Sequence, residues 1–399
     1  MAARYRLAVF NSHPIQYFAP LYKKLAAQSD IDLTVFYGSR QGVERGRLDD
    51  GFGAEVVWDV PLLEGYRHEF LRNWRRDRTV NGFFAQIIPL ILARVARGRF
   101  DAIIVHGHNS ATNLMAIAAA KMTGTRVFMR GETHLRLQRS GVKSAIRGPL
   151  MRAFYSACDA CLYIGSLNRS FYEAHGVDSR RLFFVPYTVD NERFAQEAEA
   201  SRGDRKNLRS SLGIGEHAVV VVFASKLIAR KRPMDLLEAY TRVRDAGSRV
   251  ELMFVGSGEL EDALRARVRE LGLKGVHFPG FVNQRDLPRY FAAADVFVLP
   301  SENEPWGLIV NEAMCAGLAV VTTSDVGAAA DLVRNGETGF VYPSGDVGAL
   351  ADILTNLAKE VPLRTRVAKN AVDFMSHWSY DECVDGIRAA LHAGGPPRS

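Results

Sequence analysis

The stretch AVVVVFASKLIARKRP, residues 218–233, joins a buried strand to a basic turn and the start of a helix. Ala218–Ala224 is a near-continuous apolar run, which is typical of a parallel strand covered on both faces. Pro233 suits the first turn of a helix, where a missing N–H costs nothing. Beside free backbone N–H groups, the turn carries four cations: Lys226, Arg230, Lys231 and Arg232. This arrangement predicts an anion site suited to a diphosphate, and its alternative is a solvated basic turn.

Strand and helix patterns alternate on both sides of this stretch. Further along the chain, strands are predicted at Arg249–Val255, Val276–Pro279, Val296–Pro300, Ala319–Thr323 and Gly339–Tyr342. Before it, strands are predicted at Tyr5–Asn11, Leu33–Tyr37, Ala102–His106, Arg126–Arg130, Ala160–Ile164 and Leu182–Val185. The helices expected in the first half are Pro14–Ser29, Asn81–Gly98, Ala111–Thr123 and the basic Lys143–Ala157. This alternation predicts α/β architecture with parallel sheets and right-handed crossovers.

Chain length favours two domains, since 399 residues exceed what one hydrophobic core usually holds. Residues 186–210 are charged and lack apolar periodicity, so we interpret them as a linker. We expect two Rossmann-like, doubly wound domains at 1–190 and 200–375, with a C-terminal helix at about 376–394 packing back on the first. Ligands are then expected at the carboxyl ends of the strands, in the cleft between the domains.

Composition is that of an ordinary globular protein, with 47% hydrophobic and 24% charged residues. The net charge of +7 lies in the first half: residues 1–199 carry 27 − 19 = +8, and residues 200–399 carry 24 − 25 = −1. A basic half can attract phosphate, an anionic membrane or nucleic acid, or can simply be a solvated surface. We expect no secretory signal and no membrane-spanning segment. The CxxC at Cys158 and Cys161 has no second pair to complete a zinc site.

Two further clusters carry potential chemistry in the second half. Glu304 lies in the loop after strand 296–300, and Glu312 lies inside the following helix. The N–H groups of Gly307 and Leu308 at the start of that helix can hold phosphate oxygens, while a carboxylate accepts hydrogen bonds from sugar hydroxyls. An N-cap acid and an ordinary helix glutamate are the alternative. The Gly256-Ser257-Gly258 turn after strand 249–255 is a weak signal by itself.

In combination, these motifs resemble family 4 glycosyltransferases of the GT-B fold. Lys226 and Lys231, the Gly256-Ser257-Gly258 turn, and the pair Glu304 and Glu312 occur in that family's order. The segments Phe278–Val282, Ala294–Ser301 and Glu312–Gly317 are also similar. The resemblance covers about residues 215–345 almost without gaps.

The resemblance implies a role for each of these residues. Lys226 and Lys231 bind the donor diphosphate, with Lys226 standing where arginine is more usual. Glu304 faces the donor sugar, and Glu312 holds the ribose hydroxyls. The remaining residues implied to line the donor site are Gly256, Gly258, Phe281, Val282, Trp306, Gly307 and Leu308. Such enzymes retain the anomeric configuration and use neither a metal nor a further cofactor beside the nucleotide diphosphate sugar.

The first half resembles the family less closely. The family's glycine-rich loop after its first strand is replaced by Asn11–Tyr17, in which we expect His13 and Gln16 to face the acceptor. His134 follows a strand where the family often has a histidine near the reacting sugar, so we assign it a catalytic role with Glu304 and Lys231. A plain loop histidine is the alternative.

Two apparent metal motifs are set aside. Asp30-Ile31-Asp32 is a DxD, but it lies between a helix and the entry to a strand, at the wrong end of the sheet. His106-Gly107-His108 lacks a third ligand at workable spacing.

The sequence therefore predicts a retaining, metal-independent hexosyltransferase that acts on a glycan or glycoconjugate, as in polysaccharide biosynthesis. A GT-B-like sugar-nucleotide epimerase and a non-catalytic nucleic-acid-binding protein are the alternatives. We expect a cytoplasmic protein. The basic helix 143–157, with Arg147 and Arg152, indicates docking on an anionic membrane, or else an ordinary packed helix with a wet basic face.

Overall fold

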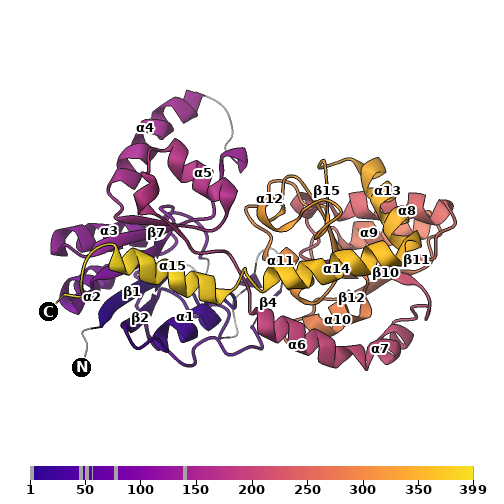
Figure 1. Ribbon diagram of the computed structural model, residues 1–399, viewed down its shortest axis with the longest axis horizontal. Helices are drawn as coiled ribbons and strands as arrows, with labels where there is room; N and C mark the ends of the chain where they lie inside the picture. Colours follow the sequence, from indigo (N-terminus) through magenta and orange to yellow (C-terminus); the bar gives the residue numbers. More distant parts are fainter. Residues whose placement is uncertain are drawn as a thin grey trace. The chain divides into compact units, whose positions relative to one another are not determined.

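The computed structural model describes residues 4–44, 48–49, 54–55, 57–75, 80–137 and 142–398 (Figure 1). Contacts divide the chain into two compact units. Unit 1 comprises Met1–Arg47, Val60–Tyr187 and Tyr380–Ser399. Unit 2 comprises Leu48–Asp59 and Thr188–Ser379. Each unit contains its own parallel sheet, as the alternating pattern predicts.

Unit 1 is built on a seven-stranded parallel sheet in the order β5-β2-β1-β6-β7-β8-β9. Its strands are β1 (Tyr5–Asn11), β2 (Ile31–Tyr37), β5 (Arg67–Phe70), β6 (Ala102–His106), β7 (Arg126–Arg130), β8 (Ala160–Tyr163) and β9 (Leu182–Phe184). Val9 of β1 pairs with Val35 on one side and Ile104 on the other, and all three are buried. Buried apolar side chains from both faces of the sheet explain why these strands read as continuous apolar runs.

The helices of unit 1 are α1 (Ala19–Ala26), α2 (Leu90–Gly98), α3 (Ala111–Thr123), α4 (Val142–Ser156), α5 (Ser166–Ala174) and α15 (Tyr380–His392). The predicted helices from Pro14 and Asn81 begin too early. Helix α1 begins only at Ala19, because Pro20 in its first turn has no N–H with which to continue a helix from earlier residues. Helix α2 begins after Pro89, because Asn73 holds the preceding segment as a loop through Ala85 O and Ile87 N–H.

Unit 2 has a six-stranded parallel sheet in the order β12-β11-β10-β13-β14-β15. Its strands are β10 (Val219–Ala224), β11 (Val250–Val255), β12 (Val276–Gly280), β13 (Val296–Leu299), β14 (Ala319–Thr323) and β15 (Phe340–Tyr342). The helices include α8 (Pro233–Asp245), α9 (Glu261–Glu270), α10 (Leu287–Ala293), α11 (Leu308–Cys315), α12 (Ala329–Leu332), α13 (Val347–Lys359) and α14 (Val361–Met375). A short antiparallel pair, β3 (Leu48–Asp49) with β4 (Ala54–Glu55), also belongs to unit 2.

The interpretation of residues 186–210 as a linker is wrong. Most of this segment forms α6 (Asn191–Arg202) and α7 (Arg205–Ser211). Arg209 is buried and donates to Asp295 at 2.8 Å and to the Ala293 carbonyl at 2.9 Å. Asp295 in turn accepts from the Val220 N–H at the start of β10. One of the charges that look like linker composition, Arg209, is therefore a buried anchor that holds α7 against the sheet.

The C-terminal helix returns to unit 1, where α15 contacts α1, β8 and β9. It begins at Tyr380 rather than at about Ser376. Its closest approach to the sheet is at Gly386, where an added Cβ atom would lie 1.8 Å from the Phe184 carbonyl oxygen of β9. Only glycine allows the helix to pack this closely.

We predict that Gly386→Ala destabilises the protein by about 1–3 kcal/mol, because the helix must move away from β9 to admit the methyl group. The urea concentration at the midpoint of unfolding should fall accordingly. Gly148→Ala in α4 is the matched control, since its added Cβ meets nothing within 4 Å. Alanine should there stabilise the helix by about 0.5–1 kcal/mol. Equal midpoints for the two variants would contradict this account of the packing.

Candidate active site

The basic turn of unit 2 places one lysine in the interior. After β10 the chain passes Lys226 and forms a single 3-10 turn, Ala229–Lys231, before α8. Lys231 is buried, and its Nζ lies 2.5 Å from Oε2 of Glu304. The exposed fraction of each of these two side chains is 10%. The structure thus joins two of the three residues predicted to be catalytic in one buried ion pair.

Glu304 is held from both sides by the backbone of the loop that follows β14. Its N–H donates to the Asp325 carbonyl at 3.1 Å, and its carbonyl accepts from the Gly327 N–H at 3.0 Å. Gly327 was not identified from the sequence. A Cβ atom there would lie 2.1 Å from the Pro305 carbonyl oxygen, so only glycine permits this approach.

Positive charge exceeds negative charge around this carboxylate. Arg230 also donates to Glu304 Oε2 at 2.9 Å and is half-exposed. Burial lowers the pKa of Lys231, Glu304 acts against this by stabilising the ammonium group, and the charges of Arg230 and Lys226 lower the pKa further. Two cations, Lys231 and Arg230, therefore share one carboxylate, and the charge of Lys226 also acts on Lys231, which is an environment suited to an additional anion. Arg230 belongs to the predicted basic cluster but was not assigned to the site.

The glycine turn after β11 packs directly on this basic segment. The Leu227 N–H donates to the Ser257 carbonyl at 2.9 Å. Gly256 and Gly258 have φ angles of +139° and +154°. Cβ atoms at these positions would lie 2.0 Å from Ser225 O and 2.6 Å from Leu227 O. The two glycines thus bring the β11 turn against the turn that carries Lys226.

Helix α11 begins beside Glu304. Gly307, with a φ angle of +90°, is the residue before the helix, and Leu308 is its first residue. Trp306 is buried, its Nε1–H donates to Asn311 at 3.0 Å, and its ring stacks on Trp378 at 5.8 Å. The side chain of Trp306 is thus a core element, and the helix N-terminus presents backbone N–H groups.

The second predicted glutamate lies in a buried polar chain. Glu312 has no exposed surface, and Gln284 Nε2 donates to its Oε1 at 3.4 Å. Arg193 of α6 donates to Gln284 Oε1 at 3.2 Å. Phe281, 36% exposed, and the half-buried Val282 lie in the loop between β12 and Gln284. Gln284 was missed because no local motif marks it.

In unit 1, His134 is buried, whereas His13 and Gln16 are half-buried in the loop after β1. The His13 Nδ1 lies 2.9 Å from Ser12 Oγ. Each of the three remains a predicted site residue.

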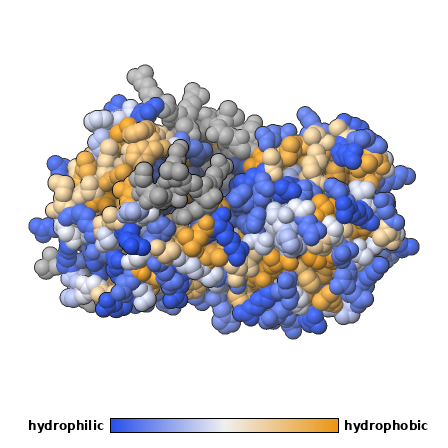
Figure 2. All heavy atoms as spheres, turned by 90° about the horizontal axis from the view of Figure 1, so that it is seen from above, coloured by the Kyte–Doolittle hydropathy of each residue, from blue (hydrophilic) through white to orange (hydrophobic). Residues whose placement is uncertain are grey.

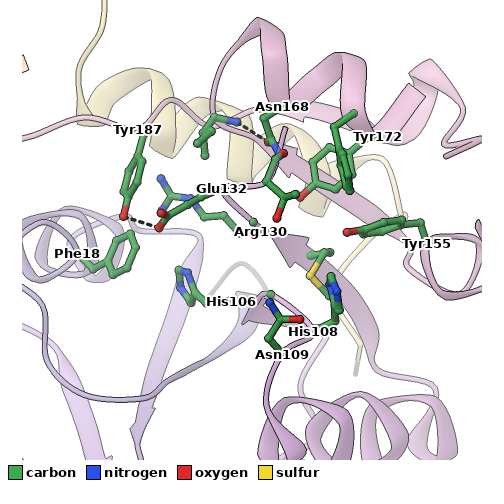
Figure 3. A pocket seen from close by; sticks show the side chains of 16 residues that line it. Phe18, His106, His108, Asn109, Arg130, Glu132, Tyr155, Asn168, Tyr172 and Tyr187 are labelled. Atoms are coloured by element: carbon green, nitrogen blue, oxygen red, sulfur yellow. Dashed lines mark hydrogen bonds between the residues drawn. The ribbon is translucent and has the colours of Figure 1, made fainter. Parts of the chain in front are cut away.

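A cavity of about 220 Å³ opens in unit 1 at the carboxyl ends of β6, β7 and β8. Figure 3 shows Arg130, Glu132, His106 and Asn109 among the side chains around it. Neither His13 nor Gln16 is among its lining residues. None of the cavity's residues was predicted from the sequence as a ligand-binding residue.

The aspartates and cysteines set aside as metal or redox motifs have structural roles. Asp30 pairs with Arg388 at 3.1 Å, and Asp32 pairs with Arg67 at 2.9 Å. Cys158 and Cys161 are free and buried in the core of unit 1, and burial raises the pKa of both thiols. Across the described residues, no group of three or more His, Cys, Asp or Glu side chains is arranged to hold a metal. No helix among those residues is both long and apolar enough to cross a membrane.

Each half of the chain matches a model of a known protein family. Residues 14–188 match the family model of the glycosyl transferase 4-like domain, and residues 204–374 match that of glycosyl transferases group 1. The D-inositol 3-phosphate glycosyltransferase of Actinosynnema mirum is 32% identical over 226 residues, which are 54% of this chain and 52% of that protein. A GDP-mannose-dependent alpha-(1-6)-phosphatidylinositol monomannoside mannosyltransferase of Mycobacterium tuberculosis is 29% identical over 216 residues, or 52% and 54% of the two chains. The chain thus spans about half the length of these curated relatives.

Solved structures extend the similarity over the whole chain. HepE of Anabaena, crystallised with UDP and glucose, superposes with a TM-score of 0.70 at 17% identity, covering 97% of this chain and 99% of HepE. WaaG, a glycosyltransferase involved in lipopolysaccharide biosynthesis, gives a TM-score of 0.67 at 18% identity, covering 98% and 100%. At such identities the likeness establishes the fold, which confirms the predicted architecture. Because a family model accounts for each half, the chain belongs to the family 4 glycosyltransferases of the GT-B fold.

Proposed function

We propose that the protein transfers a hexose from a nucleotide diphosphate sugar to a glycan or glycoconjugate, with retention of configuration and without a metal ion. The observation that carries the proposal is the buried Lys231–Glu304 pair, with Arg230 on the same carboxylate, beside the N-terminus of α11. Departure of a nucleoside diphosphate places negative charge on the leaving phosphate. Lysine and arginine side chains and helix N–H groups are the groups that stabilise such charge.

Each residue then has a chemical task in the proposal. Lys231, Arg230 and Lys226 supply the positive charge that a metal ion supplies in other transferases, and the N–H groups of Gly307 and Leu308 hold phosphate oxygens. Glu304 accepts from hydroxyls of the donor sugar. Glu312, oriented by Gln284, binds the ribose, and Phe281 and Val282 contact the base. The acceptor attacks the face from which the phosphate departs, and the leaving phosphate takes the acceptor proton. His134 lies near the reacting sugar.

The relatives leave the donor open, since HepE was crystallised with UDP-glucose and the Mycobacterium tuberculosis enzyme is GDP-mannose-dependent. We expect one of UDP, GDP or ADP, free or as a sugar conjugate, to raise the melting temperature in the presence of EDTA. A ligand at a hundredfold excess over its dissociation constant stabilises the fold by about 2.7 kcal/mol. Lys231→Ala should abolish this shift, because the phosphate loses its buried cation.

Lys274→Ala is the matched control, as this lysine is exposed in the loop before β12. It should keep the full shift. A shift that appears only when divalent metal is added would contradict metal independence. A nucleotide shift of wild-type size in Lys231→Ala would remove the basic turn from the donor site.

Glu304→Gln tests the chemical step separately from donor binding. The amide keeps the shape of the side chain and an acceptor for Lys231, but it removes the negative charge beside the donor sugar. We expect the nucleotide shift to persist and kcat to fall by about 10²-fold, comparable to the loss of one electrostatic stabiliser. The readout is acceptor-dependent release of nucleoside diphosphate, with the anomeric configuration of the product read by NMR. Wild-type turnover in this variant, or an inverted product, would overturn the proposed roles.

We further propose that the reaction takes place in the cytoplasm, at an anionic membrane that presents a lipid-linked acceptor. Unit 1 supports this with exposed apolar side chains, among them Trp74, Phe84 and Leu150. Leu150 lies in α4, and Arg152 of the same helix is also exposed. On the part of the surface that unit 1 forms in Figure 2, hydrophobic and hydrophilic side chains are interleaved. Apolar insertion combined with basic charge favours anionic over neutral membranes.

Sedimentation with vesicles tests the membrane proposal. The protein should sediment with phosphatidylglycerol vesicles and stay in solution with phosphatidylcholine vesicles. Replacing Leu150 and Arg152 together with glutamate should weaken binding by several-fold, since each basic residue contributes about 1 kcal/mol near such a surface. Equal sedimentation with both vesicle types would contradict electrostatic docking.

A further inference from the structure

The cavity of unit 1 is formed where three neighbouring strands end. His106 is the last residue of β6, Arg130 is the last residue of β7, and Ile164 follows β8 directly. In α/β sheets, ligands bind at this edge. The volume of about 220 Å³ is below the ~300–1,000 Å³ usual for drug-sized ligands, so it suits a single ring.

Arg130 forms a fixed wall of this cavity. It is buried, and its guanidinium carbon lies 5.1 Å from the centre of the Phe18 ring and 5.5 Å from that of Tyr187. Its Nη2 donates to the Pro186 carbonyl at 3.1 Å. Two aromatic rings and a carbonyl thus already stabilise the cation, as Figure 3 shows for Phe18 and Tyr187. One of its five N–H donors is used in this contact within the protein.

The carboxylate of Glu132 is positioned at the same cavity. Its Oε1 accepts from the Tyr187 hydroxyl at 2.6 Å. Burial, and then the charge of Glu132, raise the pKa of Tyr187 well above its usual value, so the phenol remains a donor. Glu132 contributes negative charge, which opposes binding of a phosphate or carboxylate.

The other polar groups are neutral and held in place. Burial, aided by Arg130, lowers the pKa of His106 to about 3, so its ring is neutral at neutral pH, and its Nε2 already lies 3.4 Å from the Tyr22 hydroxyl. Asn113 holds the His106 and Gly107 carbonyls at 2.7 and 2.9 Å. Asn168 bridges the Ile164 N–H and the Thr133 carbonyl, which fixes the loops after β7 and β8 relative to each other.

Aromatic surface completes the lining. His108 packs on Tyr155 in an edge-to-face contact at 6.3 Å, and both side chains line the cavity. Asn109, exposed at the mouth, adds an amide with both a donor and an acceptor. A carboxylate, an amide, a neutral imidazole and aromatic rings match vicinal hydroxyls and the C–H faces of a polyol ring.

We propose that this cavity binds an uncharged, hydroxyl-rich six-membered ring, a sugar or cyclitol residue of the acceptor. The inference rests on the proposed transfer reaction and names the chemical class of its acceptor. It places the acceptor ring at Glu132 and Asn109 rather than at His13 and Gln16. A phosphorylated ring is disfavoured there relative to a neutral one, because the carboxylate of Glu132 repels its phosphate.

Direct binding tests this without any turnover. Saturation-transfer difference NMR on the full chain, with and without saturating UDP, GDP or ADP, would use methyl glucoside, methyl mannoside, myo-inositol and myo-inositol 1-phosphate as probes. We expect a neutral ring to bind in at least one nucleotide state and to bind more tightly than the phosphorylated ring. Glu132→Gln and Asn109→Ala should each weaken that binding by about tenfold, the effect of one lost hydrogen bond to a charged or polar group.

Glu64→Gln is the matched control, since Glu64 is an exposed carboxylate of unit 1 outside the cavity lining. It should bind the ring as the wild type does, and all three variants should keep the nucleotide-induced melting shift. Tighter binding of the phosphorylated ring, no binding of any neutral ring, or unchanged binding in both cavity variants would overturn the inference. Loss of the nucleotide shift in the wild type, with ring binding intact, would instead count against the proposed transferase reaction.

Discussion

Burial of Lys231 is the constraint on which the unit 2 site depends. An ammonium group in the protein interior is unstable without a compensating anion, and Glu304 provides it at 2.5 Å. The pair joins the turn after β10 to the loop after β13, two neighbouring strands of the sheet. In the free protein, Lys231 is therefore neutralised by the protein's own carboxylate, with the positive charge of Arg230 left in excess.

Glycine makes that ion pair geometrically possible. Gly256 and Gly258 let the β11 turn lie against the carbonyls of Ser225 and Leu227, and Gly327 does the same for the loop that holds Glu304. Larger residues at these positions would push the loops apart by the width of a methyl group. A charged pair at hydrogen-bond distance tolerates no such displacement. The ion pair therefore depends on the close backbone contacts that the glycines allow.

The sequence predicts unit 2 better than unit 1 for a physical reason. Lys231, Gly256 and Glu304 each follow an apolar strand within a few residues, so strand pattern and residue type together indicate a site. The unit 1 cavity is lined by Phe18, Arg130 and Tyr187, which are far apart in the sequence. No local motif therefore predicts that they form a site. Helix α7 was missed because Arg209 reads as polar, although its pairing with Asp295 allows it to be buried.

The two units stabilise a buried cation in different ways, and this difference bears on what each can bind. Lys231 is neutralised by the carboxylate side chain of Glu304, and a bound phosphate would offer it equal or greater negative charge. Arg130 contacts two neighbouring buried aromatic rings and donates to a backbone carbonyl, and none of these can leave without disrupting the fold. A cation that is neutralised by a side-chain carboxylate is suited to binding a ligand whose charge changes during the reaction. Aromatic rings and a carbonyl that stay in place are suited to a rigid part of a binding site. In the proposed reaction, the charged steps thus take place at unit 2, and unit 1 recognises the shape and hydroxyls of an uncharged ring.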